Sequence, residues 1–248
     1  KISDIETYRP VNYYGKFHGR VTLRSALANS YNIPAVRTLN QLGVNSFIDH
    51  ARRMGISTWN DPTRYGLSLT LGGGEVTMLD MSRAYGTFAN LCSRVDLDPF
   101  KTVSSLDNDK LYEHQVRKIP VLSEGSSYVI SDILSDNVAR QGAFGAGSLL
   151  EIPGYKVAVK TGTTDSKKDN WTIGYTPEFL VTVWVGNNDN SPMNPALASG
   201  VTGAAPIWNR VMTMLLTNYS TQNSWFNKPD SVVGKPCFGG KVEYFLPG

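Results

Sequence analysis

Apolar residues in the first half of the chain recur every three to four positions, which is the spacing of an amphipathic helix. Leu23 and Leu27 fall on one face of such a helix, and Thr22 stands where an N-terminal cap is needed. Pro34 and Gly43 bracket a second helix, because proline fits a first turn and glycine suits a helix end. The same spacing predicts helices over residues 21–29, 34–43, 44–54, 77–90, 123–138 and 204–216.

The pattern changes to alternation in the second half, and alternation is typical of strands. Runs rich in β-branched and aromatic residues predict three strands, over residues 155–164, 170–175 and 179–186. Short turns separate these runs, so an antiparallel meander is the simplest topology. Helices followed by a strand block and a closing helix predict an α+β fold, in which an antiparallel sheet is flanked by helices on one or both faces.

The connecting segments are rich in glycine, proline and polar residues. Asp107-Asn108-Asp109 lies between two extended runs, 100–106 and 110–117, and predicts a hairpin. Asp189 and Asn190 are predicted turn residues. The other segments are an extended lead-in over 1–20, a glycine bend over 71–74, a glycine-rich mobile loop near the site over 141–148, a polar loop over 165–169, and a tail from 218 whose pattern predicts no fold.

Composition excludes several classes of protein. The net charge of +3 comes from scattered lysines and arginines, so nucleic-acid binding receives no support. The three histidines lie far apart and Cys92 and Cys237 are the only cysteines, so no metal site or other cofactor is spelled out. Whether the two cysteines pair stays open. No apolar run reaches the 18 or so residues of a membrane span.

The run YKVAVKTGTT at 155–164 combines a strand with reactive groups. Lys160 and Gly162 fall on one side of the pleat, and Thr161 and Thr163 fall on the other. A cation, hydroxyls and a free backbone edge in one groove suit an extended peptide that ends in a carboxylate. A lysine on an exposed strand is also commonly only a solvated charge. The tetrapeptide therefore needs its structural context before it counts as a site.

Ser30-Tyr31-Asn32 is the second candidate. Ser30 ends one predicted helix and Pro34 begins the next, so a short loop can present the Ser30 and Asn32 side chains together. Ser135-Asp136-Asn137 matches the same pattern, but Ser135 lies inside a predicted amphipathic helix, where a polar residue facing solvent is the simpler explanation. Trp171 and Tyr175 are predicted to be core aromatics.

These motifs resemble those of the penicillin-binding proteins, and within them the transpeptidase domain of the bifunctional class A type. The wider family carries Ser-x-x-Lys, Ser-Asp-Asn and Lys-Thr-Gly. The second motif is present as Ser30-Tyr31-Asn32 and the third as Lys160-Thr161-Gly162, extended by Thr163. The likeness continues through GRVTLRSALANSYNIPAV, LGGGEVT, AYGTFAN, NWTIGYTPEFLVTVWVGNND, TGAAPIWNRVM and EYFLPG.

One departure from the family is large. No serine stands three residues before a lysine; the nearest match is Thr164 before Lys167. In the family that motif precedes the Ser-x-Asn segment, and the chain starts at Lys1 without a methionine. The resemblance therefore implies a serine β-lactamase/transpeptidase-like fold that lacks its N-terminal elements, truncated by cloning, proteolysis or a split chain. A partial transpeptidase domain would span residues 1–217, and residues 218–248 would form a tail of uncertain fold.

The resemblance also implies roles for single residues. Ser30 would relay a proton toward the leaving amine, and Asn32 would hold the substrate amide and help orient the absent lysine. Lys160 would supply positive potential for the terminal carboxylate. Thr161 and Thr163 would hydrogen-bond that carboxylate beside Gly162, and the Thr163 backbone N–H would be one oxyanion donor.

The implied activity is a D,D-transpeptidase that cross-links peptidoglycan stem peptides ending in D-Ala-D-Ala through a serine acyl-enzyme, and that β-lactams inhibit. The implied location is the outer face of a bacterial cell membrane, with an anchor and a glycosyltransferase domain upstream. Without the nucleophile, these 248 residues alone are expected to be inactive. The alternatives are a D,D-carboxypeptidase or β-lactamase relative, although neither Glu75 nor Glu113 is a convincing deacylating group, and a non-catalytic sensor of peptidoglycan or β-lactam.

Overall fold

A three-stranded antiparallel sheet forms the centre of the second half of the chain. The structure is a computed structural model that describes residues 9–13, 15–164, 167–194, 202–221, 225–237 and 240–247. The strands are β5 (Ala158–Thr163), β6 (Asp169–Tyr175) and β7 (Leu180–Gly186), in the order β5-β6-β7. The predicted meander is therefore confirmed. Its register pairs Lys160 with Ile173 and Gly162 with Trp171, and among the described residues no strand pairs with the other edge of β5.

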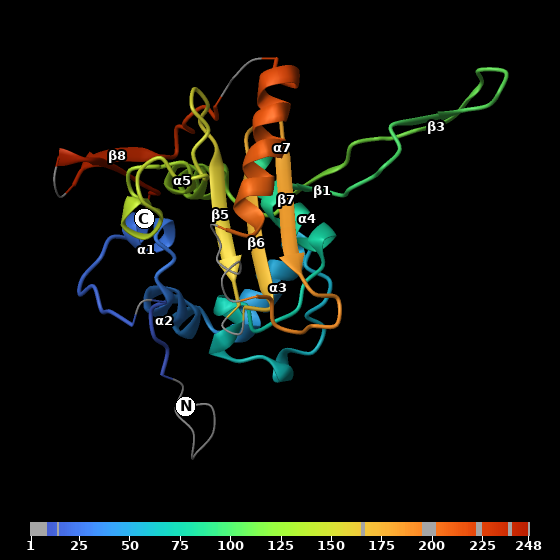
Figure 1. The fold of residues 1–248 in the computed structure, drawn as a ribbon. Coiled ribbons are helices and arrows are strands. Elements are labelled where there is room, and N and C mark those ends of the chain that lie inside the picture. Colours follow the sequence, from blue (N-terminus) through green and yellow to red (C-terminus); the bar gives the residue numbers. More distant parts are fainter. Residues whose placement is uncertain are drawn as a thin grey trace.

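Helices cover both faces of this sheet, as Figure 1 shows. On one face α7 (Ala204–Tyr219) packs Trp208 and Met212 against Val159 and Val181. Gly174 makes this contact possible, because a Cβ there would lie 2.4 Å from Cζ2 of Trp208. The opposite face is covered by α4 (Met78–Ala89) and α5 (Glu124–Leu134). The predicted α+β architecture is confirmed.

The first half of the chain is helical, as the spacing predicted. The helices are α1 (Leu23–Ala28), α2 (Asn32–Leu42) and α3 (Val44–Met54), followed by the 3-10 turns η1 (Pro62–Arg64) and η2 (Leu67–Leu71). Thr22 caps α1 by accepting a hydrogen bond from the Ser25 N–H, and Gly55 ends α3 in the left-handed conformation. Residues 1–8 and Tyr14 of the predicted lead-in lie outside the described residues.

Two predictions about the segment after α5 were wrong. The helix ends at Leu134 rather than near residue 138, because the Asp136 carboxylate accepts the Ala139 N–H in a turn of its own. Ser135 is the C-cap, 8% exposed, and does not face solvent. The glycine-rich loop begins with a short helix, α6 (Gln141–Phe144).

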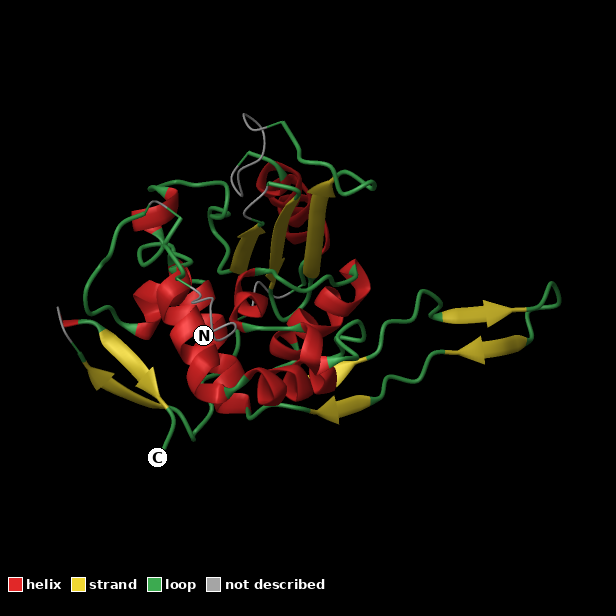
Figure 2. Cartoon of the chain, turned by 90° about the horizontal axis from the view of Figure 1, so that it is seen from below, coloured by secondary structure: helices red, strands yellow, loops and turns green. Residues whose placement is uncertain are grey.

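Two hairpins extend from the body (Figures 1 and 2). The predicted hairpin around residue 108 is confirmed: β2 (Thr102–Ser104) pairs with β3 (Lys110–Glu113), on a base formed by β1 (Ser93–Val95) and β4 (Lys118–Pro120). The tail forms a second hairpin from β8 (Val233–Pro236) and β9 (Val242–Phe245). Phe226 and Val232 are buried against Tyr128 and Tyr175, so the tail packs on the core.

The remaining local predictions concern turns, cysteines and membrane spans. Asn190 is left-handed and its N–H donates to the Asn187 carbonyl, which confirms the predicted turn. Cys92 and Cys237 are free thiols. Within the described part of the chain, no helix combines the length and the apolar character that crossing a bilayer requires.

Candidate active site

A cavity of about 1480 Å³ lies between the sheet and the helices. The turn between α1 and α2, the glycine bend after η2, α4 and the three strands all contribute residues to its wall. The wall includes every residue that the two motifs predicted, namely Ser30, Asn32, Lys160, Thr161, Gly162 and Thr163. The fold therefore brings together two motifs that lie about 130 residues apart in sequence.

Ser30 and Lys160 are in direct contact across this cavity. The Lys160 ammonium donates a hydrogen bond to the Ser30 hydroxyl, and also to the Thr161 carbonyl at 2.7 Å. Ser30 reaches this position because α1 ends in a Schellman motif: the Ser30 N–H donates to the Leu27 carbonyl and the Tyr31 N–H to the Ala26 carbonyl. Ser30 occupies the left-handed position of that motif, with φ 56°.

The surroundings of Lys160 weaken its hold on a proton. Burial, together with the positive charge of Arg140, lowers the pKa of Lys160 to about 8. Arg140 is only 3% exposed, and its guanidinium donates to the Leu134 carbonyl. Burial lowers the pKa of Arg140 to about 10. A lysine with such a pKa can both give and take a proton near neutral pH, which general acid–base chemistry requires.

Asn32 begins α2 and contacts the lead-in. Its side-chain amide donates to the Val11 carbonyl at 2.9 Å. Nearby, Asn12 accepts a hydrogen bond from the Ile33 N–H at 3.3 Å, and the His18 ring stacks on Tyr31 with centroids 4.1 Å apart. Val11, Asn12 and His18 of the lead-in therefore lie against the Ser-x-Asn turn, a contact that the aperiodic sequence of this segment does not predict.

The hydroxyl of Thr163 is held by a residue that sequence reasoning missed. Asn170 is fully buried on β6 directly opposite Thr163, and its amide donates to the Thr163 hydroxyl at 3.2 Å. The Asn170 carbonyl oxygen accepts the Ala204 N–H at 2.7 Å. This asparagine therefore joins the Lys-Thr-Gly-Thr strand to the start of α7. Asn170 could have been found as a polar residue paired with Thr163 on the neighbouring strand. That pairing follows from the strand register, which the sequence alone does not give.

Two tryptophans and an aspartate line the end of the same cavity. The rings of Trp171 and Trp184 are 6.4 Å apart, and the Trp184 indole N–H donates to Asp169 at 2.9 Å. Trp171 is only half-buried and faces the cavity, so its assignment to the core was wrong. Tyr175 is fully buried, and its hydroxyl is hydrogen-bonded to Ser131 at 2.8 Å, which confirms the assignment for that residue.

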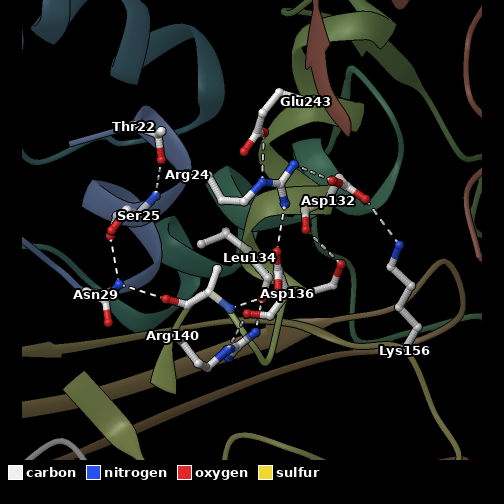
Figure 3. A network of polar contacts seen from close by, with 12 residues as sticks. Thr22, Arg24, Ser25, Asn29, Asp132, Leu134, Asp136, Arg140, Lys156 and Glu243 are labelled. Atoms are coloured by element: carbon white, nitrogen blue, oxygen red, sulfur yellow. Dashed lines mark hydrogen bonds and ion pairs between the residues drawn. The ribbon is translucent and has the colours of Figure 1, made fainter. Parts of the chain in front are cut away.

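A buried arginine anchors the helix that leads to Ser30. Arg24 on α1 is 8% exposed and binds three carboxylates, at 2.8 Å to Asp132, 3.2 Å to Asp136 and 2.8 Å to Glu243 (Figure 3). Burial acts to lower the pKa of Arg24, but hydrogen bonds and charge from Asp132 and Glu243 outweigh it, so the pKa is raised. The alternative Ser-x-Asn motif at Ser135 lies in this network, and its serine donates to the Asp132 carbonyl rather than facing the cavity.

The family model described as the penicillin binding protein transpeptidase domain matches residues 3–213. The chain belongs to this family. It is 29% identical over 234 residues to penicillin-binding protein 1A/1B of Bacillus subtilis, an alignment that covers 88% of this chain and 25% of that protein. It is 33% identical over 218 residues to penicillin-binding protein 1A of Aquifex aeolicus, covering 88% of this chain and 29% of that protein.

The transpeptidase fold is also that of solved structures. Penicillin-binding protein 1A from Haemophilus influenzae superposes with a TM-score of 0.83 at 23% identity, over 97% of this chain and 42% of that chain. PonA1 from Mycobacterium tuberculosis in complex with penicillin V gives a TM-score of 0.73 at 23% identity, over 96% of this chain and 65% of that chain. The chain thus spans between a quarter and three tenths of the two curated relatives described above.

Proposed function

We propose that this domain cross-links peptidoglycan as a serine D,D-transpeptidase acting on stem peptides that end in D-Ala-D-Ala. The observation that carries the proposal is the contact between Lys160 and Ser30 in a cavity lined by both family motifs. In the reaction, a serine hydroxyl adds to the penultimate carbonyl, the terminal D-alanine leaves as an amine, and the amine of a neighbouring stem then takes the acyl group and releases the serine.

The residues of this chain divide the work around that serine. Ser30, in contact with Lys160, relays the proton to the departing amine. Lys160 and Thr161 attract the substrate carboxylate beside Gly162, and the Thr163 N–H stabilises the oxyanion. Asn32 turns from the Val11 carbonyl to the substrate amide when the peptide binds along the edge of β5 that faces away from β6.

The nucleophile belongs, in this proposal, to a Ser-x-x-Lys segment that the 248 residues do not contain. The cavity, at about 1480 Å³, exceeds the roughly 300 to 1,000 Å³ of ordinary ligand pockets, so it has room for such a segment as well as the substrate. The segment would enter against the half-buried Trp171 and Trp184. We place the intact protein at the outer face of the cell membrane, where peptidoglycan lies, anchored outside this sequence.

Acylation by a labelled penicillin tests the proposal. The natural chain that includes the upstream segment is expected to gain the mass of one penicillin, and the 248 residues alone are expected to gain none; intact mass spectrometry reads both. If the longer chain stays unmodified, the proposal that it is a transpeptidase is contradicted, and the alternative of a non-catalytic sensor is favoured. An adduct on the isolated 248 residues contradicts the assignment of the nucleophile.

A pair of serine variants in the longer chain tests the site. Ser30→Ala is expected to lower the acylation rate by about 10²-fold or more, the range of general acid–base help. Ser135→Ala removes the serine of the competing Ser-x-Asn motif, whose hydroxyl lies away from the cavity. It is expected to leave the rate within about threefold of the parent. Equal losses in the two variants would remove the reason to prefer Ser30.

A further inference from the structure

The side chain that precedes Ser30 fastens the Ser30 turn to a distant segment. Asn29 is 7% exposed, and all of its polar atoms are hydrogen-bonded. Its amide donates to the Ser25 carbonyl at 2.9 Å within α1 (Figure 3) and to the Ala139 carbonyl at 2.7 Å. Its oxygen accepts the Ala143 N–H at 2.9 Å. Two of the three bonds thus cross to the segment 139–143.

That segment is closely fitted to the Asn29 side chain. A Cβ added to Gly142 would lie 3.0 Å from the Asn29 oxygen, so a larger residue fits there only if Asn29 moves by a few tenths of an ångström. The same segment carries Arg140, the charge that acts on Lys160, and Ala143 in the cavity wall. Asn29 therefore joins the turn that presents Ser30 to the segment that shapes the surroundings of Lys160.

A second turn of the chain shows that these cross-links are not needed to form the turn itself. At the end of α4, Asn90 donates to the Gly86 carbonyl at 2.9 Å, as Asn29 does to Ser25. Leu91 is left-handed with φ 57°, and the Leu91 and Cys92 N–H groups close the same Schellman motif. Asn90 is exposed and, among the described residues, its side chain makes no other hydrogen bond.

We propose that Asn29 is a positioning residue, which holds the Ser30 hydroxyl against Lys160 by fastening the Ser30 turn to the segment 139–143. This inference rests on the proposed function only in assigning Ser30 and Lys160 to catalysis. Asn29 itself touches no reacting atom. Without its two cross-links the turn still forms, as at Asn90, but its distance from Lys160 is no longer set.

The test compares Asn29→Ala with the matched control Asn90→Ala in the longer natural chain. Both variants lose the hydrogen bond from the asparagine side chain to the carbonyl four residues earlier in its helix. Any effect of losing that local bond should therefore appear in both variants. Asn29→Ala is expected to lower the rate constant of penicillin acylation at least tenfold while the dissociation constant of the initial complex changes less than twofold. Asn90→Ala is expected to change neither more than twofold. An Asn29→Ala rate within twofold of the parent, or an equal loss in Asn90→Ala, overturns the proposal.

A second readout does not depend on activity. The Lys160 side chain is titrated by NMR in the 248-residue chain, with the assignment made by Lys160→Met. Asn29→Ala is expected to shift the apparent pKa of Lys160 by at least 0.3, because its contacts change, and Asn90→Ala is expected to leave it in place. Should Asn29→Ala fail to fold, Asn29→Ser, whose side chain is uncharged and too short to reach both Ala139 and Ala143, takes its place with the same expected shift. An unmoved Lys160 pKa overturns the positioning role even if the parent is never acylated, whereas an unacylated parent overturns only the proposed function.

Discussion

A single lysine shows how far its neighbours decide its chemistry. Lys160 stands on a strand where sequence alone allows a solvated surface charge. In the fold its ammonium contacts Ser30 and lies within the electrostatic reach of Arg140. Burial acts first and the arginine adds to it, so the pKa of Lys160 falls to about 8. Burial and the neighbouring Arg140 thus disfavour the protonated ammonium, so Lys160 is partly neutral near physiological pH.

Replacing Arg140 by glutamine is expected to raise the pKa of Lys160, because a neighbouring positive charge disfavours the protonated ammonium. Burial remains in the variant, so the pKa stays below 10.5. NMR titration of the Lys160 side chain measures it, and Arg210→Gln, which removes an exposed charge from α7, is the control. A lower Lys160 pKa in Arg140→Gln than in the parent contradicts this account, and so does an ordinary lysine pKa for Lys160 in the parent.

The same pKa has a consequence for stability with a definite sign. Between about pH 8 and 10.5 the unfolded lysine holds its proton and the folded one has lost it. Because stability rises with pH wherever the unfolded state binds more protons, Lys160 costs the folded state up to about 3 kcal/mol below pH 8, and this cost disappears toward pH 10.5. The measurement is the free energy of unfolding of the parent and of Lys160→Met between about pH 7 and pH 10.5. The difference between the two curves gives the contribution of Lys160 to the pH dependence of stability.

Secondary-structure elements in this fold are joined by charge as well as by apolar packing. Arg24 connects α1 to α5 through Asp132, to the turn after α5 through Asp136, and to β9 through Glu243. Lys156, just before β5, adds an ion pair to Asp132 at 3.2 Å (Figure 3). The helix that leads to Ser30, the helix behind the sheet and the C-terminal hairpin are thereby held in one network.

Arg24→Met is expected to lower the free energy of unfolding by about 3 to 5 kcal/mol, because removal of the cation leaves three largely buried carboxylates without their partner. Denaturant unfolding of the 248-residue chain measures the loss. The control is Arg52→Met, since Arg52 pairs with Asp49 at the surface, where the two side chains are 48% and 68% exposed. That variant should lose less than about 1 kcal/mol. Similar losses of unfolding free energy in the two variants would mean that the Arg24 ion pairs stabilise the fold no more than a surface ion pair does.

On the scale of the whole molecule, the two hairpins that extend from the body differ in how they contribute to its packing. The hairpin of β2 and β3 extends away from the body with both strands exposed (Figure 2). The C-terminal hairpin instead follows buried Phe226 and Val232, and its Tyr244 ring packs edge-on against Tyr128 at 5.5 Å. One hairpin is an appendage, and the other completes the packing around α5.

Deleting the two hairpins should therefore change the free energy of unfolding by very different amounts. Replacing residues 98–115 by a short glycine-rich turn is expected to change the free energy of unfolding by less than about 1 kcal/mol, because the strands bury no core residue. Deleting residues 225–248 is expected to cost at least about 3 kcal/mol, since it exposes the surface under Phe226 and Val232 and removes Glu243 from Arg24. Calorimetry of the two variants measures these changes. A larger loss of stability from replacing residues 98–115 than from deleting residues 225–248 would contradict the claim that only the C-terminal hairpin supports the core.

Periodicity and local chemistry determined much of this protein. Helical spacing located the helices, alternation located the three strands, and the two motifs named the residues that line the cavity. These features depend on neighbours within a few positions, so they are visible in the chain itself. The errors at Ser135 and at the end of α5 arose where Asp136 forms a turn that overrides the helical spacing.

Only the tertiary structure decided which of these residues meet. The contact of Ser30 with Lys160, the bond of Asn170 to Thr163, and the anchoring of Asn29 to Ala139 and Ala143 each join positions whose proximity no local pattern encodes. The burial of Arg140 beside Lys160 depends on the same packing. Sequence thus determined the chemical groups, and folding determined their distances and pKa values, because burial and charge act through space rather than along the chain.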